Sequence, residues 1–116
     1  MKIAERTLGN VTVIDVGGPI TLGDGDTDRL GDKVRSLLQQ GRKQLIANLS
    51  NVSYMDSAGL GELVQAYTTV SRQGGSLKLV GVTKRLNDLL VITKLATVFD
   101  SYESEAAAAA SFGAPA

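Results

Sequence analysis

The hydrophobic positions of the chain follow two periods, and the first is typical of amphipathic helices. Apolar residues three and four positions apart fall on one side of a helix with 3.6 residues per turn. Three such stripes occur: Leu30, Val34, Leu37 and Leu38; Leu60, Leu63, Val64, Tyr67 and Val70; and Leu86, Leu89 and Leu90. Gly41 and Gly74-Gly75 are expected to end the first two helices, and Thr83 is expected to cap the third.

The second pattern consists of short apolar runs, which predict strands buried on both faces. Residues 45–49 and 77–82 are such runs. Residues 3–16 are rich in β-branched side chains around Gly9-Asn10, so we expect two short strands joined by a turn. Gly17-Gly18-Pro19 is expected to break the second of these strands. Val98-Phe99 is a candidate for a last short strand. An alanine-rich final helix is expected at about 103–112, with a short tail at 113–116.

The predicted order is strand, strand, helix, strand, helix, strand, helix, strand, helix. Strands that alternate with helices indicate an α/β fold, with a mostly parallel sheet of four to five strands and about four helices. Neither an internal repeat nor a domain boundary is evident, so we expect one domain over residues 1–116. Binding sites in such folds gather at the carboxyl ends of the strands. The segment after the strand that ends at Leu49 is therefore a candidate site.

Composition narrows the classes of function. The chain has 116 residues, 43% of them hydrophobic, so it is expected to fold around one core. Twelve basic and twelve acidic residues cancel, which argues against nucleic acid or an anionic membrane as partner. We find no stretch long enough to span a membrane and no signal-peptide pattern, so we expect a cytoplasmic protein. The absence of cysteine and histidine removes the commonest metal ligands and the commonest general base, and no cofactor is expected.

The most informative stretch is Tyr54–Gly61, where a hydrophobic strand is expected to pass into a helix. Asp56 and Ser57 place an acid beside a hydroxyl, and Gly59 and Gly61 fall in the expected first helical turns. Each glycine costs a helix about 1 kcal/mol relative to alanine. One interpretation is that the bare backbone lets a ligand, a partner or a phosphate on Ser57 come close. The alternatives are that Asp56 or Ser57 only caps the helix and that the glycines only allow the helix to pack on the sheet.

Enzymatic interpretations of the same stretch lack essential groups. As a hydrolase nucleophile, Ser57 would need a base; no histidine exists, and Met55 replaces the first glycine of the Gly-x-Ser-x-Gly elbow. As a phospho-acceptor of the receiver-domain type, Asp56 would need an acidic pair after the first strand, where Gly17-Gly18-Pro19 stands. A nucleotide-binding Gly-x-x-x-x-Gly-Lys-[Ser/Thr] loop does not occur. We therefore predict that the chain is not an enzyme.

Residues 48–61, with the core Asp56-Ser57-Ala58-Gly59-Leu60-Gly61, resemble the signature of STAS-domain anti-sigma-factor antagonists. Residues 74–79 and 86–95 also fit that family, so the resemblance covers nearly the whole chain. It implies a single STAS domain that binds an anti-sigma factor with serine kinase activity and thereby frees a sigma factor. Phosphorylation of Ser57 would release the anti-sigma factor, and a serine/threonine phosphatase would reset the switch.

The resemblance also implies which residues meet the partner: Asp56, Ser57, Ala58, Gly59, Leu60, Gly61 and Thr21. Many members carry an acid where this chain has Asn48 and another where it has Thr21, and both positions are expected near the serine. Valine at Gly59 or Gly61 is expected to weaken association more than stability. The alternative function is that of a STAS subunit never phosphorylated at Ser57, in a stress-signalling scaffold or a lipid- or anion-transport complex.

Overall fold

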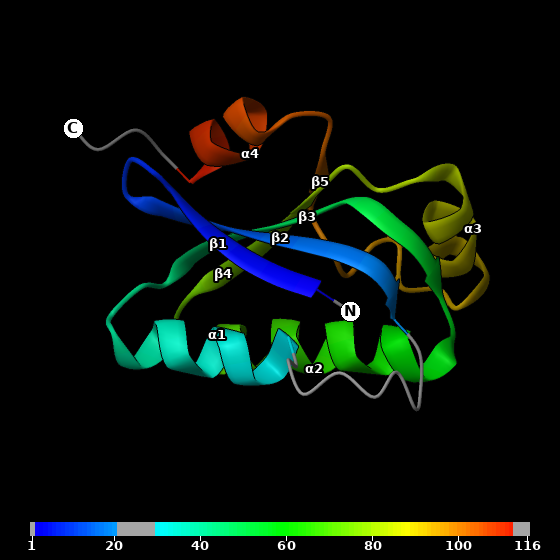
Figure 1. The fold of residues 1–116 in the computed structure, drawn as a ribbon, viewed down its shortest axis with the longest axis horizontal. Helices are drawn as coiled ribbons and strands as arrows, with labels where there is room; N and C mark the ends of the chain where they lie inside the picture. The colour runs from blue at the N-terminus through cyan, green and yellow to red at the C-terminus, as the bar shows by residue number, and fades with distance from the viewer. Residues whose placement is uncertain (1, 21–29, 113–116) are drawn as a thin grey trace.

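The computed structural model describes residues 2–20 and 30–112, which form a sheet with helices on both faces (Figure 1). In chain order the elements are β1 (Lys2–Leu8), β2 (Val11–Ile20), α1 (Leu30–Gln39), β3 (Gln44–Met55), α2 (Ser57–Arg72), β4 (Ser76–Val80), α3 (Lys84–Ile92), β5 (Ser101–Tyr102) and α4 (Glu105–Ser111). The strands lie in the order β1-β2-β3-β4-β5. β1 is antiparallel to β2 and all other neighbours are parallel, which confirms the mostly parallel α/β sheet.

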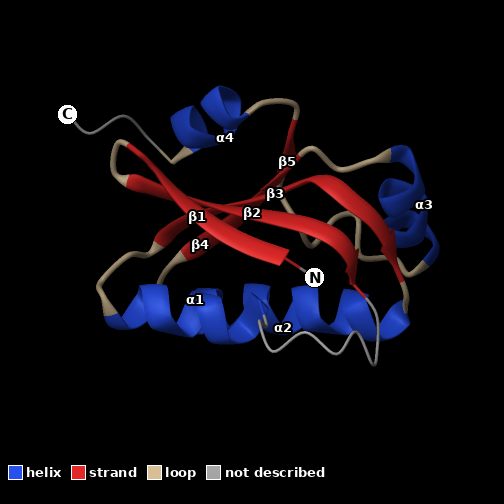
Figure 2. Ribbon diagram, viewed as in Figure 1, coloured by secondary structure: helices blue, strands red, loops and turns tan. Residues whose placement is uncertain are grey.

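The helices form unequal layers around the sheet. α1 and α2 lie side by side on one face, α4 lies on the other, and α3 stands beside the far end of β3 (Figure 2). The main core fills the space under α1 and α2, with fully buried side chains that include Ile14, Leu37, Leu49, Leu63 and Leu79. A smaller cluster of Val11, Val13, Ile46 and Val80 packs against Ala108 of α4. No helix in the described part of the chain has the length and apolar character needed to cross a bilayer.

The two central strands are longer than the sequence pattern predicted. β2 continues through Gly17-Gly18-Pro19 to Ile20, and β3 continues past Leu49 to Met55. The extended parts pair with each other, Gly18 with Val52 and Ile20 with Met55, across register shifts at Asp15/Gly17 and Gly18/Pro19. Such irregular pairing tolerates a proline and the positive φ of +79° at Gly18. Gly17-Gly18-Pro19 would break a regular strand, but here these residues only bend β2.

The chain after α3 also differs from expectation. The last short strand is Ser101–Tyr102 and not Val98-Phe99, because Phe99 turns into the core, where its ring meets Tyr67 edge-on at 5.1 Å. The final helix begins at Glu105, later than about 103, because the Ser104 side chain caps it by accepting from the Ala107 amide. The predicted cap at Thr83 is confirmed, and Gly41 and Gly74 follow α1 and α2 with positive φ.

A polar network fastens α4 to the sheet. Arg6 on β1 donates to Asp15 on β2 at 2.6 Å and also to Glu105 of α4. The Asn48 side chain of β3 donates to Glu105 at 2.7 Å. The guanidinium of Arg6, followed by the Asn48 amide, lowers the pKa of Glu105, and Arg6 lowers the pKa of Asp15. Asn48 is therefore a donor in this network, and it lies about 17 Å along the sheet from Met55, because the same span takes five residues of the paired β2. The expectation that position 48 is near Ser57 was wrong.

Changing this donor to an acid is expected to loosen α4. An Asn48→Asp variant would place a carboxylate against Glu105 and remove the amide that now satisfies it, at a cost of about 1–2 kcal/mol. Denaturant unfolding measures this loss, and Asn51→Asp, an exposed change on the same strand, is the matched control. Equal stability of the two variants would contradict the assigned role of Asn48.

Candidate functional site

The site is the turn between β3 and α2, held by Asp56. Asp56 has extended backbone angles, and its Oδ1 accepts from the Gly59 amide at 2.8 Å, which makes it the N-cap of α2. Its own amide donates to the Ile20 carbonyl at 3.3 Å, so the turn is also tied to β2. The helix begins at Ser57. Of the two residues that could have capped the helix, Asp56 does so.

Ser57 and Ala58 are exposed on the first turn of α2, while Asp56 is half-buried. α2 has 16 residues and no acid in its first turn, so the partial positive charge of its N-terminus is offset by the capping carboxylate of Asp56 and not by an acid within that turn. The first amides of a helix have no partner within the helix and commonly bind phosphate. The arrangement thus presents a hydroxyl to solvent at a place that suits an anion.

The two glycines of the motif have different roles. Gly59 is buried, and a Cβ added there would lie 2.1 Å from the Ile20 carbonyl oxygen. Gly59 therefore lets α2 pack directly on the end of β2, and the expectation that it keeps the surface bare for a partner was wrong. Gly61 is exposed, and a Cβ there would meet nothing within 4 Å.

The other expected contact residues also differ in their exposure to solvent. Leu60 is 4% exposed and belongs to the core, so its side chain supports the turn from inside and presents no surface to a partner. Thr21 lies outside the described residues. The exposed part of the expected contact set is thus Ser57, Ala58 and Gly61, beside the half-buried Asp56.

A groove next to this turn was missed by the sequence analysis. It runs between the end of β3 and α3 and is lined by Val52, Ser53, Tyr54, Met55, Thr83, Arg85, Leu86, Leu89 and Ile92. The exposed Tyr54 and Ile92 mark it in the structure, since large apolar side chains rarely remain in water in groups, but their exposure is not visible in the sequence. Within residues 2–20 and 30–112, no three carboxylates are grouped so as to hold a metal ion.

Comparison with known proteins agrees with this geometry. The STAS domain family matches residues 2–108. The anti-sigma-B factor antagonist of Bacillus subtilis is 45% identical over 71 residues, which are 61% of this chain and 64% of that protein. The anti-sigma-B factor antagonist of Staphylococcus aureus is 33% identical over 82% of this chain and 86% of its own length.

Solved structures share the fold at lower identity. The anti-sigma factor antagonist SpoIIAA in its unphosphorylated form superimposes with a TM-score of 0.72 at 16% identity, covering 97% of this chain and all of that one. The phosphorylated form of Bacillus SpoIIAA gives 0.68 at 18% identity, covering 91% and 96%. The family match over most of the chain and the antagonist relatives lead to one assignment: this chain belongs to the STAS domain family, among its anti-sigma-factor antagonists.

Proposed function

We propose that this protein binds an anti-sigma factor when Ser57 is unmodified and releases it when that anti-sigma factor, acting as a serine kinase, phosphorylates Ser57. The observation that carries the proposal is the exposed Ser57 on the first turn of α2, next to an aspartate that already caps the helix. Relatives named anti-sigma-B factor antagonists, and a structural neighbour solved in both phosphorylation states, support the same role.

The proposed contact surface consists of Asp56, Ser57, Ala58 and Gly61, extended by Thr21. Gly61 leaves the helix bare on this side, so a partner's backbone can approach the first turns closely. Gly59 and Leu60 hold the turn against the sheet from behind. The surface thus combines a rigid support with a small contact area in which Asp56 is the charged side chain and position 57 is neutral.

Phosphorylation would act through charge and not through refolding. A phosphate adds about −1.5 to −2 charge, which the N-terminus of α2 accommodates. A partner surface built around a neutral hydroxyl would then have to bury a dianion beside Asp56, at a cost of several kcal/mol. Shifting binding from 99:1 to 1:99 needs about 5.5 kcal/mol, so one phosphate is of the right size. A serine/threonine phosphatase would restore the binding form, and the cycle would run in the cytoplasm with the sigma factor.

The proposal is tested by intact-mass analysis after incubation with the cognate anti-sigma factor and Mg-ATP. We expect one added phosphate on the protein without substitutions and on a Ser53→Ala control, which removes an exposed serine four residues away. We expect none on Ser57→Ala. If the protein without substitutions gains no phosphate, Ser57 is not an acceptor and the alternative of an unphosphorylated STAS subunit is favoured. If Ser57→Ala still gains one, the acceptor is another residue.

A further inference from the structure

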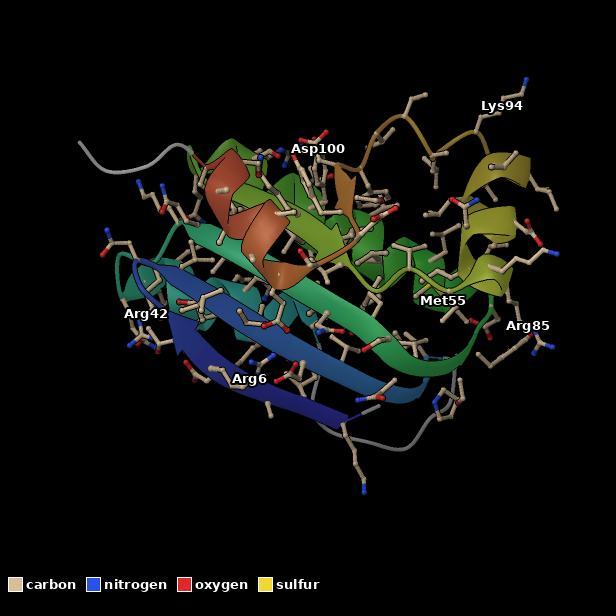
Figure 3. The ribbon with its side chains drawn as sticks, turned by 90° about the horizontal axis from the view of Figure 1, so that it is seen from above. Arg6, Arg42, Met55, Arg85, Lys94 and Asp100 are labelled. Atoms are coloured by element: carbon tan, nitrogen blue, oxygen red, sulfur yellow. The ribbon has the colours of Figure 1, made fainter. Side chains whose placement is uncertain are left out.

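The groove between β3 and α3 is a separate feature with its own chemistry. It measures about 300 Å³, and Met55 and Arg85, both labelled in Figure 3, mark its strand wall and its helix wall. Small-molecule sites begin at about this size, roughly 300 Å³, and are mostly apolar with a few polar groups that orient the ligand. The groove therefore has room for a short ligand.

The walls of the groove are apolar and open to water. Tyr54 is 48% exposed and Ile92 is 77% exposed, and they face a floor that includes the buried Val52, Met55 and Leu86. An exposed isoleucine at the rim of an apolar floor costs free energy in the empty protein. Covering that surface with an alkyl chain would recover about 25 cal/mol for each Å² removed from water.

One charge distinguishes the groove from a plain apolar patch. Arg85, in the first turn of α3, is the charged residue of the lining, and no acid among the described residues lines the groove. Among the described residues, no carboxylate comes within 4 Å of its guanidinium; Asp88, one turn further along α3, is not paired with it. The other polar groups of the described lining are the hydroxyls of Ser53, Tyr54 and Thr83. An arginine presented in this way suits a carboxylate, which it can bind through two parallel hydrogen bonds.

We propose that this groove binds a small amphipathic monocarboxylate, with the alkyl chain along Met55, Leu89 and Ile92 and the carboxylate at Arg85. The modest volume favours a medium-length chain, so octanoate is the probe. This proposal does not depend on the proposed phosphorylation of Ser57. Its test measures ligand binding to the isolated protein, without the anti-sigma factor or ATP.

The test is an amide NMR titration with octanoate, octanol and octylammonium. We expect octanoate to shift the amides of the groove lining and to bind about fivefold more tightly than octanol, the gain of one partly exposed charge pair. Octylammonium is expected to bind more weakly than octanol, because its charge is repelled by Arg85. Equal affinity of octanoate and octanol, or shifts that do not map to the groove, would overturn the proposal.

Three variants at exposed positions keep the test independent of folding. Arg85→Gln is expected to reduce octanoate affinity to that of octanol, whereas Arg72→Gln, an exposed arginine at the end of α2, leaves it unchanged. Ile92→Ser is expected to weaken octanoate and octanol alike. If octanoate fails to bind while Ile92→Ser weakens association with the anti-sigma factor, the groove belongs to the protein partner and the carboxylate site is rejected.

Discussion

A Ser57→Asp variant is expected to lose at least about a hundredfold in affinity for the anti-sigma factor, whereas Ser57→Ala keeps the affinity of the unmodified protein. The hydroxyl is exposed on the first turn of α2, so both side chains fit without disturbing the core. Alanine adds no charge to the surface. Aspartate places a second carboxylate beside Asp56, where the partner would have to bury it.

Isothermal titration calorimetry measures this difference, and a hundredfold change corresponds to about 2.7 kcal/mol. Ser71→Asp is the matched control, because it adds the same charge to an exposed serine at the other end of α2. Its affinity should equal that of the unmodified protein. Equal binding by the Ser57→Ala and Ser57→Asp variants would show that charge at this position does not control the complex.

The second large effect is on stability. Gly59→Ala is expected to destabilise the fold by about 2–4 kcal/mol, at the upper end of what overpacking costs. The new Cβ would lie 2.1 Å from the Ile20 carbonyl oxygen and 2.8 Å from its Cγ2, so either α2 or the end of β2 must move. That carbonyl also accepts from the Asp56 amide, so the movement would loosen the turn itself.

Gly61→Ala provides the matched control two residues along the same helix. Its Cβ would meet nothing within 4 Å, so the better helix propensity of alanine should raise stability by up to about 1 kcal/mol. Thermal or denaturant unfolding distinguishes the two variants. A Gly59→Ala protein as stable as the unmodified one would contradict the direct packing of α2 on β2.

Much of the fold could be predicted because its helices and central strands bury regular apolar stripes. The stripe from Leu60 to Val70 predicted α2, and the run at residues 45–49 predicted the buried half of β3. The remainder of β3 was missed because its exposed residues, apart from Tyr54, are polar and only Val52 and Met55 return to the core. Pairing with the end of β2 across two register shifts decides its conformation, and such a contact is not visible in local spacing.

The site could be predicted only where reactive or polar side chains lie at a helix start that the sequence pattern itself indicates. Asp56 and Ser57 were recognised because an acid and a hydroxyl precede a helical stripe. The role of Gly59 depends on Ile20, nearly forty residues earlier in the sequence, and the hydrogen bond of Asn48 depends on Glu105. The groove between β3 and α3 likewise combines segments about thirty residues apart, so no single stretch of the sequence predicted it.

The central claim is that a charge on Ser57 separates two proteins that otherwise bind. The most direct measurement compares the affinity of the anti-sigma factor for unmodified protein, for protein phosphorylated at Ser57, and for the same sample after phosphatase treatment. We predict tight binding, loss of at least about two orders of magnitude, and full recovery. Unchanged affinity of the phosphorylated protein would contradict the account.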